Sequence, residues 1–219
     1  PGNSVMERCA IAGDVDNDGD VDFIRNNSNR LELYLNNGAV NGYTFGNGVN
    51  QDPDFVLYTA NTNNNNPPDG IPDGMKTEGI GFIDYDNDGD LDLMIENHNW
   101  GIDIYQNNTI PSGIFSLTHV TPGTGFPLGL DQTATDGDYS SVTDFDDDGF
   151  FDIYITHTSS AVMLKNNGNN TFTDVANSSG TILNQYAWCG NFLDFDHDED
   201  EDLYVCTTNQ NLANAFFVN

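Results

Sequence analysis

The residues best placed to do chemistry are aspartates that recur with one fixed spacing. The pattern Asp-x-Asp-x-Asp-Gly-x-x-Asp occurs as DVDNDGDVD at residues 14–22, as DYDNDGDLD at residues 84–92 and as DFDDDGFFD at residues 144–152. A fourth copy, DFDHDEDED at residues 194–202, keeps the same aspartates but has Glu199 where the others have glycine. If the chain curls at the glycine, the first, third, fifth and ninth carboxylates converge and the seventh residue offers its backbone carbonyl. A hard divalent cation such as calcium prefers this oxygen shell, and the spacing matches the first nine positions of a calcium loop.

A solvated acidic turn is the alternative interpretation of any single copy. Because the four copies have matching surroundings, we expect calcium at three to four of them. The fourth loop is the exception, since Glu199 must make a turn that glycine makes more easily. A residue with a Cβ atom resists positive φ. His197, also in this loop, occupies a position that is not a ligand position and is expected to face solvent.

The composition excludes several classes of partner. Asp plus Glu total 35 against 5 for Lys plus Arg, and the formal net charge is -30. Nucleic acids and anionic membranes are therefore poor partners, because few groups here could neutralise phosphates. No stretch has the apolar length of a membrane span, so we expect no membrane insertion. The chain is 37% hydrophobic and 11% aromatic, which predicts a folded protein rather than a disordered acidic one. Its first residue is Pro1, which suggests a processed chain or a segment of a longer one.

The three cysteines leave two interpretations open. Cys9 and Cys189 each precede the first aspartate of a loop by five residues, so they are equivalent in the repeat. Cys189 and Cys206 flank the fourth loop and could face each other across a hairpin, where a disulfide could form. The other interpretation is three small buried residues, because free cysteine is commonly buried.

The spacing of the loops indicates internal repeats. Their first aspartates fall at residues 14, 84, 144 and 194. Around each loop the alternation of apolar and polar residues predicts strand, loop, strand, hairpin, strand, turn and strand, which is a four-stranded antiparallel meander. We expect a single domain over residues 1–219, with a last unit that lacks its outermost strand. The repeats are predicted at about residues 6–60, 76–121, 137–176 and 186–219, with insertions at about 46–75 and 121–136.

The fourth strands are the least regular part of this pattern. They are predicted around residues 43–45, 114–115 and 171–175, and the apolar run at 55–58 is an additional strand candidate inside the first insertion.

Units of this form resemble the FG-GAP or VCBS repeats of integrin alpha subunits and of many secreted microbial proteins. The resemblance is close at residues 84–92, at 144–152 and at KNNGNNTFTDV, residues 165–175. It covers nearly the whole chain apart from the two insertions. It implies an all-β fold, a β-propeller commonly of about seven blades, with one calcium loop between the first two strands of a blade. Four units make a small ring at best, so we expect part of a larger propeller, or a part completed by another chain.

The resemblance also assigns ligands position by position. Side-chain ligands would be the first, third, fifth and ninth aspartates of each loop, and the seventh residue would contribute its carbonyl oxygen. The side-chain set is Asp14, Asp16, Asp18, Asp22, Asp84, Asp86, Asp88, Asp92, Asp144, Asp146, Asp148, Asp152, Asp194, Asp196, Asp198 and Asp202, and the carbonyl set is Asp20, Asp90, Phe150 and Asp200.

Three functions are compatible with these features. The first is a calcium-stabilised extracellular scaffold for adhesion or assembly, secreted or at the cell surface, whose partners are other proteins or further copies or segments of the same protein. The second is a calcium-dependent lectin that binds glycans, with Trp100 in a hairpin turn as the best candidate stacking platform. The favoured alternative for Trp100 is that it covers a blade edge, and Trp188 is expected in the core. The third, an enzyme, is disfavoured because the dense carboxylate clusters are needed for metal and no hydrolase, metalloprotease or phosphate-loop motif occurs. A non-catalytic part of a secreted enzyme stays open.

Overall fold

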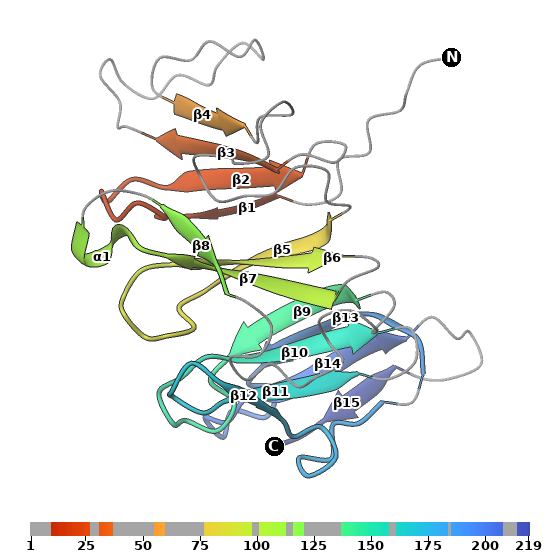
Figure 1. Ribbon diagram of the computed structural model, residues 1–219. Helices are drawn as coiled ribbons and strands as arrows, with labels where there is room; N and C mark the ends of the chain where they lie inside the picture. The colour runs from red at the N-terminus through yellow and green to blue at the C-terminus, as the bar shows by residue number, and fades with distance from the viewer. Residues whose placement is uncertain are drawn as a thin grey trace, which may run out of the picture.

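The computed structural model of the chain is all-β, as the sequence predicts (Figure 1). One helical turn, α1 (Thr109–Ser112), is its only helix in the described residues, and none there is long and apolar enough to cross a membrane. The structure describes residues 10–26, 31–36, 55–59, 77–97, 101–112, 116–120, 137–157, 161–183, 185–207 and 214–219.

The strands form four antiparallel sheets, each made from consecutive strands. Sheet 1 contains β1 (Ala10–Gly13), β2 (Asp22–Asn26), β3 (Leu31–Asn36) and β4 (Phe55–Thr59). Sheet 2 contains β5 (Thr77–Ile83), β6 (Asp92–Asn97), β7 (Gly101–Asn107) and β8 (Leu117–His119). Sheet 3 contains β9 (Gly137–Thr143), β10 (Asp152–His157), β11 (Val162–Asn166) and β12 (Phe172–Asp174). Sheet 4 contains β13 (Ala187–Leu193), β14 (Asp202–Thr207) and β15 (Ala215–Phe217).

The predicted meander is confirmed, but the outer strand of sheet 1 was assigned wrongly. Residues 55–59 form β4, which pairs with β3 from Asn36–Phe55 to Glu32–Thr59. Part of the predicted insertion 46–75 is therefore the outer strand itself. The longer connection costs little, because loop-closure entropy grows slowly with length, and an aromatic and β-branched segment pairs well in a sheet. Residues 43–45 and 114–115 and the insertion 121–136 lie outside the described residues, whereas β12 falls within the predicted 171–175.

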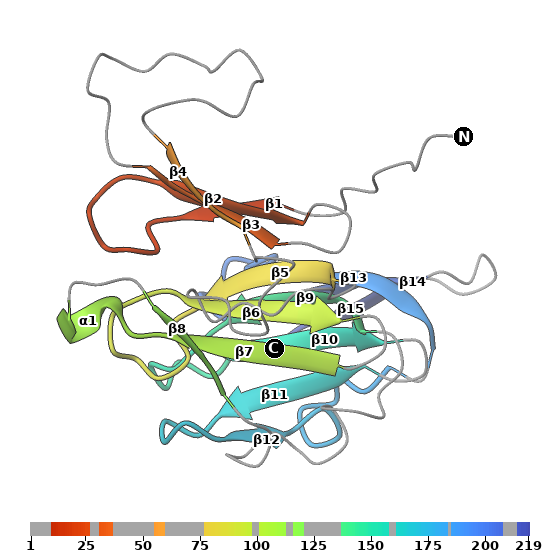
Figure 2. The same cartoon turned by 45° about the horizontal axis from the view of Figure 1, so that its top comes forward.

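The sheets follow one another in series, and their first strands lie side by side. Contacts join β1 to β5, β5 to β9 and β9 to β13. Sheets 1 and 4 lie at opposite ends of the stack of described residues, which does not close into a ring (Figures 1 and 2). Four small antiparallel sheets are thus established, whereas a complete propeller stays a prediction.

A hydrophobic cluster fills each space between consecutive sheets. Because side chains alternate along a strand, one strand serves two interfaces. In β6, Leu93 and Ile95 face sheet 1 and Met94 faces sheet 3. Tyr154 of β10 then joins Leu203 of β14 in the cluster between sheets 3 and 4. Full burial of one such side chain contributes about 1.5–3 kcal/mol, so these clusters hold the sheets together.

A second, polar link joins each sheet to the one before it. Asn107 and Asn166 end the third strand of their sheets and Asn219 lies two residues after it, and we call them, with Asn36 at the end of β3, the clasp asparagines. The side-chain amides of Asn107, Asn166 and Asn219 donate to backbone carbonyls of the preceding sheet's loop. The donor–acceptor distances are 2.6 Å from Asn107 to Val15, 2.8 Å from Asn166 to Tyr85 and 3.1 Å from Asn219 to Phe145.

The clasp predicts a large effect from a small substitution. Replacing Asn166 by alanine removes the amide that satisfies the Tyr85 carbonyl, and both groups are buried. We expect the free energy of unfolding to fall by about 1–3 kcal/mol, the cost of an unsatisfied buried polar group. Chemical denaturation in calcium measures it.

The matched control is Asn167→Ala. This neighbour is exposed and bonds only within its own turn to Thr171 and Thr173. We expect a loss below about 0.5 kcal/mol. Equal losses for the two alanine variants would contradict the clasp.

Candidate metal centres

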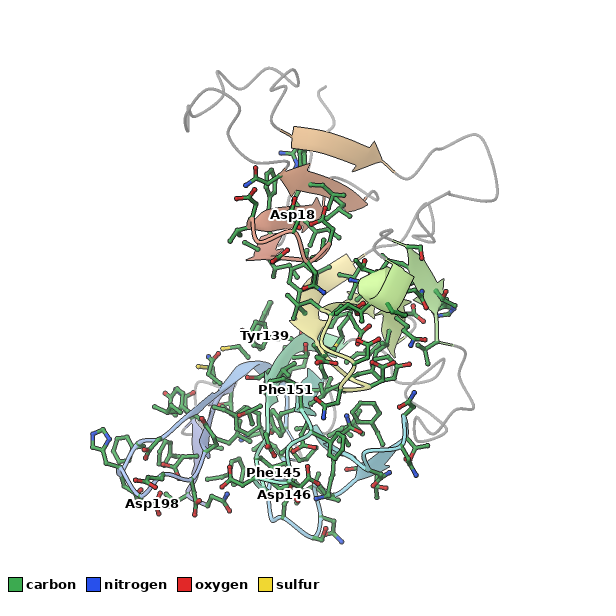
Figure 3. The ribbon with its side chains drawn as sticks, turned by 90° about the vertical axis from the view of Figure 1, so that its left-hand side faces the viewer. Asp18, Tyr139, Phe145, Asp146, Phe151 and Asp198 are labelled. Carbon is green, nitrogen blue, oxygen red and sulfur yellow. The ribbon has the colours of Figure 1, made fainter. Side chains whose placement is uncertain are left out.

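The four aspartate loops connect the first strand to the second in every sheet. We number them loops 1 to 4, and they all lie at the same side of the molecule. Figure 3 views this side and labels Asp18, Asp146 and Asp198 in loops 1, 3 and 4. Antiparallel pairing of the flanking strands brings the two ends of each loop together, for example Gly13 opposite Asp22 in sheet 1.

In each loop three carboxylates converge closely enough to share one ion. One oxygen from each lies within 4.8 Å of the others. All four groups contain the first and third aspartates of the loop. The third member is the fifth aspartate in loop 1 and the ninth aspartate in the other loops. The groups are Asp14, Asp16 and Asp18; Asp84, Asp86 and Asp92; Asp144, Asp146 and Asp152; and Asp194, Asp196 and Asp202.

The first aspartate shapes its loop by accepting backbone hydrogen bonds. In loop 1 the two oxygens of Asp14 accept from the N–H groups of Asp18, at 3.1 Å, and Gly19, at 3.0 Å. Loops 2 and 3 repeat both bonds. The fifth aspartate accepts from the N–H of the seventh residue in all four loops. These bonds fold each loop around its carboxylates.

Each loop requires positive φ at its fourth and sixth positions. In the first three loops the sixth residue is glycine, with φ between 90° and 94°, and the fourth is Asn or Asp, which tolerate this region. In loop 4 the residues are His197, at 63°, and Glu199, at 76°. Asp194 there accepts from the N–H of His197, at 2.7 Å. The predicted strain at Glu199 is confirmed, and the exposed position of His197 is as predicted.

The ninth aspartate fastens the loop to its sheet. Asp92 is buried, and its two oxygens accept from the backbone N–H of Tyr85, at 2.9 Å, and of Asn107, at 2.7 Å. Burial raises the pKa of Asp92 to about 8 and that of Asp152 to about 6. The same pair of bonds is made by Asp22, Asp152 and Asp202.

Several carboxylate oxygens in these loops are buried without a hydrogen-bond partner. They are one oxygen each of Asp16, Asp86 and Asp90. Burial raises the pKa of Asp16 and of Asp90 to about 6 and raises that of Asp86. A buried carboxylate without a partner is costly, whereas a cation would satisfy it. The residues present therefore fit a metal ion.

In loop 3 a side chain supplies positive charge to the carboxylates. The ammonium of Lys165 contacts Asp146 and lies 2.8 Å from Asp148, which holds the pKa of Asp148 below its usual value. In loop 2 the equivalent residue, Gln106, donates to Asp86 at 2.6 Å. Neither residue was predicted from the sequence. The signal for them is their place immediately before a clasp asparagine.

Other predicted residues have different outcomes. Trp100 lies outside the described residues. The prediction that Trp188 is in the core is wrong: it is 61% exposed, because a register shift between Ala187 and Cys189 interrupts the alternation there. Cys189 and Cys206 face each other across β13 and β14 as predicted, and both are free thiols. Burial raises the pKa of Cys189. Cys9 lies outside the described residues.

Comparison with known families finds a match that spans parts of sheets 3 and 4. Residues 144–205, which run from loop 3 into β14, match the family model described as an FG-GAP-like repeat. The chain thus contains an FG-GAP-like repeat, and the predicted resemblance is confirmed over this range. A search of curated proteins finds no significant match.

The strain in loop 4 can be relieved by substitution. We expect Glu199→Gly to raise the free energy of unfolding by roughly 1 kcal/mol, because glycine adopts positive φ without a Cβ clash. Gly149→Ala in loop 3 is the reciprocal variant. No atom lies within 4 Å of the added Cβ. We therefore expect Gly149→Ala to lower the free energy of unfolding by a similar amount, and this loss would come from the backbone conformation alone. Denaturant unfolding measures both, and a destabilised Glu199→Gly protein would contradict the assignment.

The buried carboxylates predict an unusual pH dependence without calcium. The pKa of Asp92 is about 8 and those of Asp16 and Asp152 about 6, well above that of an unfolded aspartate. The folded state therefore binds more protons, and stability falls as pH rises through this range. We expect the melting temperature in chelator to increase by roughly 5 °C from pH 8.5 to 5. In saturating calcium this rise in melting temperature on acidification should vanish, because protons then compete with the ion for the carboxylates. Stability that falls on acidification in chelator would contradict this.

Proposed function

We propose that this chain is a calcium-stabilised extracellular scaffold of propeller-type blades that serves adhesion or protein assembly and has no catalytic role. The observation that carries the proposal is the convergence of three carboxylate oxygens within 4.8 Å in every loop. A converging carboxylate triad in all four sheets supports a role that belongs to the repeat rather than to one special site.

Calcium suits these loops better than the other common metals. The ligand atoms are all oxygens, and nitrogen or sulfur ligands that would favour zinc are missing from the clusters. Carboxylates plus a backbone carbonyl can supply the six to eight flexible ligands of calcium, whereas magnesium demands a stricter octahedron and keeps several waters. When bound, the ion would supply the positive charge that the buried oxygens of Asp16 and Asp86 lack.

The same loops connect metal binding to the packing of the sheets. The ninth aspartate bonds the second residue of its loop, and the carbonyl of that residue accepts the clasp amide of the next sheet. Any group that stabilises the loop therefore stabilises the contact between two sheets. At a calcium concentration about ten times the dissociation constant, each site adds about 1–2 kcal/mol.

The affinity expected for such loops favours an extracellular location. Extracellular calcium modules bind with dissociation constants of roughly 10⁻⁴–10⁻³ M, which suits the calcium concentration outside cells. Loops that lack the bidentate glutamate of an EF-hand belong in this range. The net charge of -30 keeps such a surface soluble and unattractive to phosphates.

The absence of a catalytic role rests on how the carboxylates are used. The densest acidic clusters are the loops, and an ion wrapped by protein oxygens offers no open position to a substrate. Protein partners, including further copies of this chain, suit a scaffold of stacked sheets, whose free faces invite association.

Thermal melting in millimolar calcium, millimolar magnesium and excess chelator tests the proposal. We expect the melting temperature to be highest in calcium and lowest in chelator. Asp16→Asn and Asp20→Asn form a matched pair, because both lie in loop 1 and both remove one charge. The first removes a proposed side-chain ligand and should lose most of the calcium gain from loop 1. The second should keep it, because Asp20 is expected to offer only its backbone carbonyl.

Identical melting in calcium and chelator would overturn the proposal and leave the loops as solvated acidic turns. Equal losses for Asp16→Asn and Asp20→Asn would show an effect of net charge alone and would contradict the ligand assignment.

A further inference from the structure

Two cysteines lie directly opposite each other in sheet 4. The pairing of β13 with β14 places Cys189 against Cys206, and both residues are half-buried free thiols. Residues opposite one another in an antiparallel pair have Cα atoms about 4.5–5.5 Å apart. A disulfide bridges Cα atoms that are about 4.4–6.8 Å apart. The strand register therefore already holds the two backbones at the separation that a disulfide needs.

A β-bulge in the first strand sets this opposition. The register shifts between Ala187 and Cys189, so that the pairing skips Trp188. The same shift occurs at the equivalent place in sheets 2 and 3. The pairs that follow it there are Gly79 with Glu96 and Tyr139 with Thr156. The position of the two cysteines is thus a recurrent feature of the repeat, and only its residue types are particular to sheet 4.

In sheets 2 and 3 the side chain on the second strand reaches across to the first strand at this position. The carboxylate of Glu96 lies so close to Gly79 that a Cβ atom there would clash with it. The hydroxyl of Thr156 donates to the carbonyl of Tyr139 at 3.1 Å. The same reach in sheet 4 brings one sulfur atom toward another.

The environment of the thiols suits a lasting cross-link. Both cysteines keep part of their surface exposed, and Trp188 beside Cys189 is 61% exposed, so a small oxidant can approach. Burial, followed by hydrogen bonding with the Cys206 thiol, raises the pKa of Cys189. A thiol of high pKa is a poor leaving group, so a disulfide here would be reduced slowly. These properties differ from those of a site for rapid thiol exchange.

The hairpin between the two cysteines carries loop 4, which departs from the other loops. Glu199 holds a φ of 76° where the others have glycine. Asp194 accepts from the N–H of His197, one residue earlier than the first N–H that the leading aspartate accepts in loops 1 to 3. A cross-link at the base of the hairpin would lower the entropy of the unfolded segment that has to form this loop.

We propose that Cys189 and Cys206 form a disulfide that closes the hairpin around loop 4 and so restrains the loop that lacks the glycine. The proposal rests on the extracellular location proposed above, because disulfides persist in oxidising compartments.

The oxidant is a small disulfide such as oxidised glutathione. One cysteine thiolate attacks a glutathione sulfur and releases one glutathione thiolate, and the other cysteine thiolate then attacks the mixed disulfide and releases the second. The two protein thiols thereby give up two protons and two electrons, and one glutathione disulfide becomes two thiols.

Peptide mapping of the full chain tests the pairing. The protein is held with calcium in a mixture of oxidised and reduced glutathione. Its free thiols are then trapped with N-ethylmaleimide, and the chain is digested with pepsin in acid, where thiolates are too few for disulfides to exchange. We expect two peptides joined through Cys189 and Cys206, and a Cys9 peptide that carries the maleimide.

Thermal melting tests the restraint on the hairpin. Oxidised wild-type protein should melt roughly 6–12 °C above the same protein reduced with dithiothreitol, as expected for a closed segment of this length. Cys9→Ser and Cys206→Ser are matched variants, because each replaces one sulfur atom by oxygen. Cys9→Ser should keep the difference and Cys206→Ser should lose it. If Cys206→Ser fails to fold, Cys189→Ser replaces it.

Three results would overturn the proposal. Maleimide on both Cys189 and Cys206 after oxidation would show that the thiols stay free, and a bond from Cys9 to either of them would show a different pairing. A disulfide between Cys189 and Cys206 that leaves the melting temperature unchanged would exclude the restraint. A protein with free thiols that still melts higher in calcium than in chelator would keep the scaffold function and lose only the disulfide.

Discussion

The structure depends on one buried carboxylate in each repeat, the ninth aspartate of the loop. In sheet 2 this is Asp92, whose two oxygens hold the backbone N–H groups of Tyr85 and Asn107. One bond closes the loop and the other fixes the end of the third strand. Burial raises the pKa of Asp92 to about 8, so its charge is costly without a positive partner nearby. An ion in the loop would provide that partner and would thereby couple metal binding to the fold.

From this carboxylate a chain of hydrogen bonds runs through the molecule. Tyr85 donates to Asp92 within its loop and accepts from Asn166 of the next sheet, whose own N–H bonds Asp152. The hydrophobic clusters follow the same succession, because each lies between two consecutive sheets. Such an array has a stability that is close to a sum of repeat and nearest-neighbour terms. Its last sheet therefore keeps an interface that no sheet in the described residues covers.

The sequence predicts the local features well and the long-range ones less well. The loops and the meander follow from spacing within a few residues, where the turn geometry and strand alternation leave little choice. The outer strand of sheet 1 was misplaced because pairing with β3 depends on a distant segment, and loop length gives no signal for it. Trp188 was misjudged because a register shift in β13 changes which side chains face the core. The clasp and the contact of Lys165 with loop 3 join segments far apart in the chain. The only feature of the sequence that marks these positions is the repeated Asn-Asn pair.

Equilibrium dialysis against radioactive calcium at millimolar free ion tests the central claim most directly, namely that the aspartate loops hold calcium. The account predicts three to four ions per chain for the wild type and one fewer when Asp144 and Asp146 of loop 3 are both replaced by alanine. A count near zero, or a count unchanged by that double substitution, would contradict it.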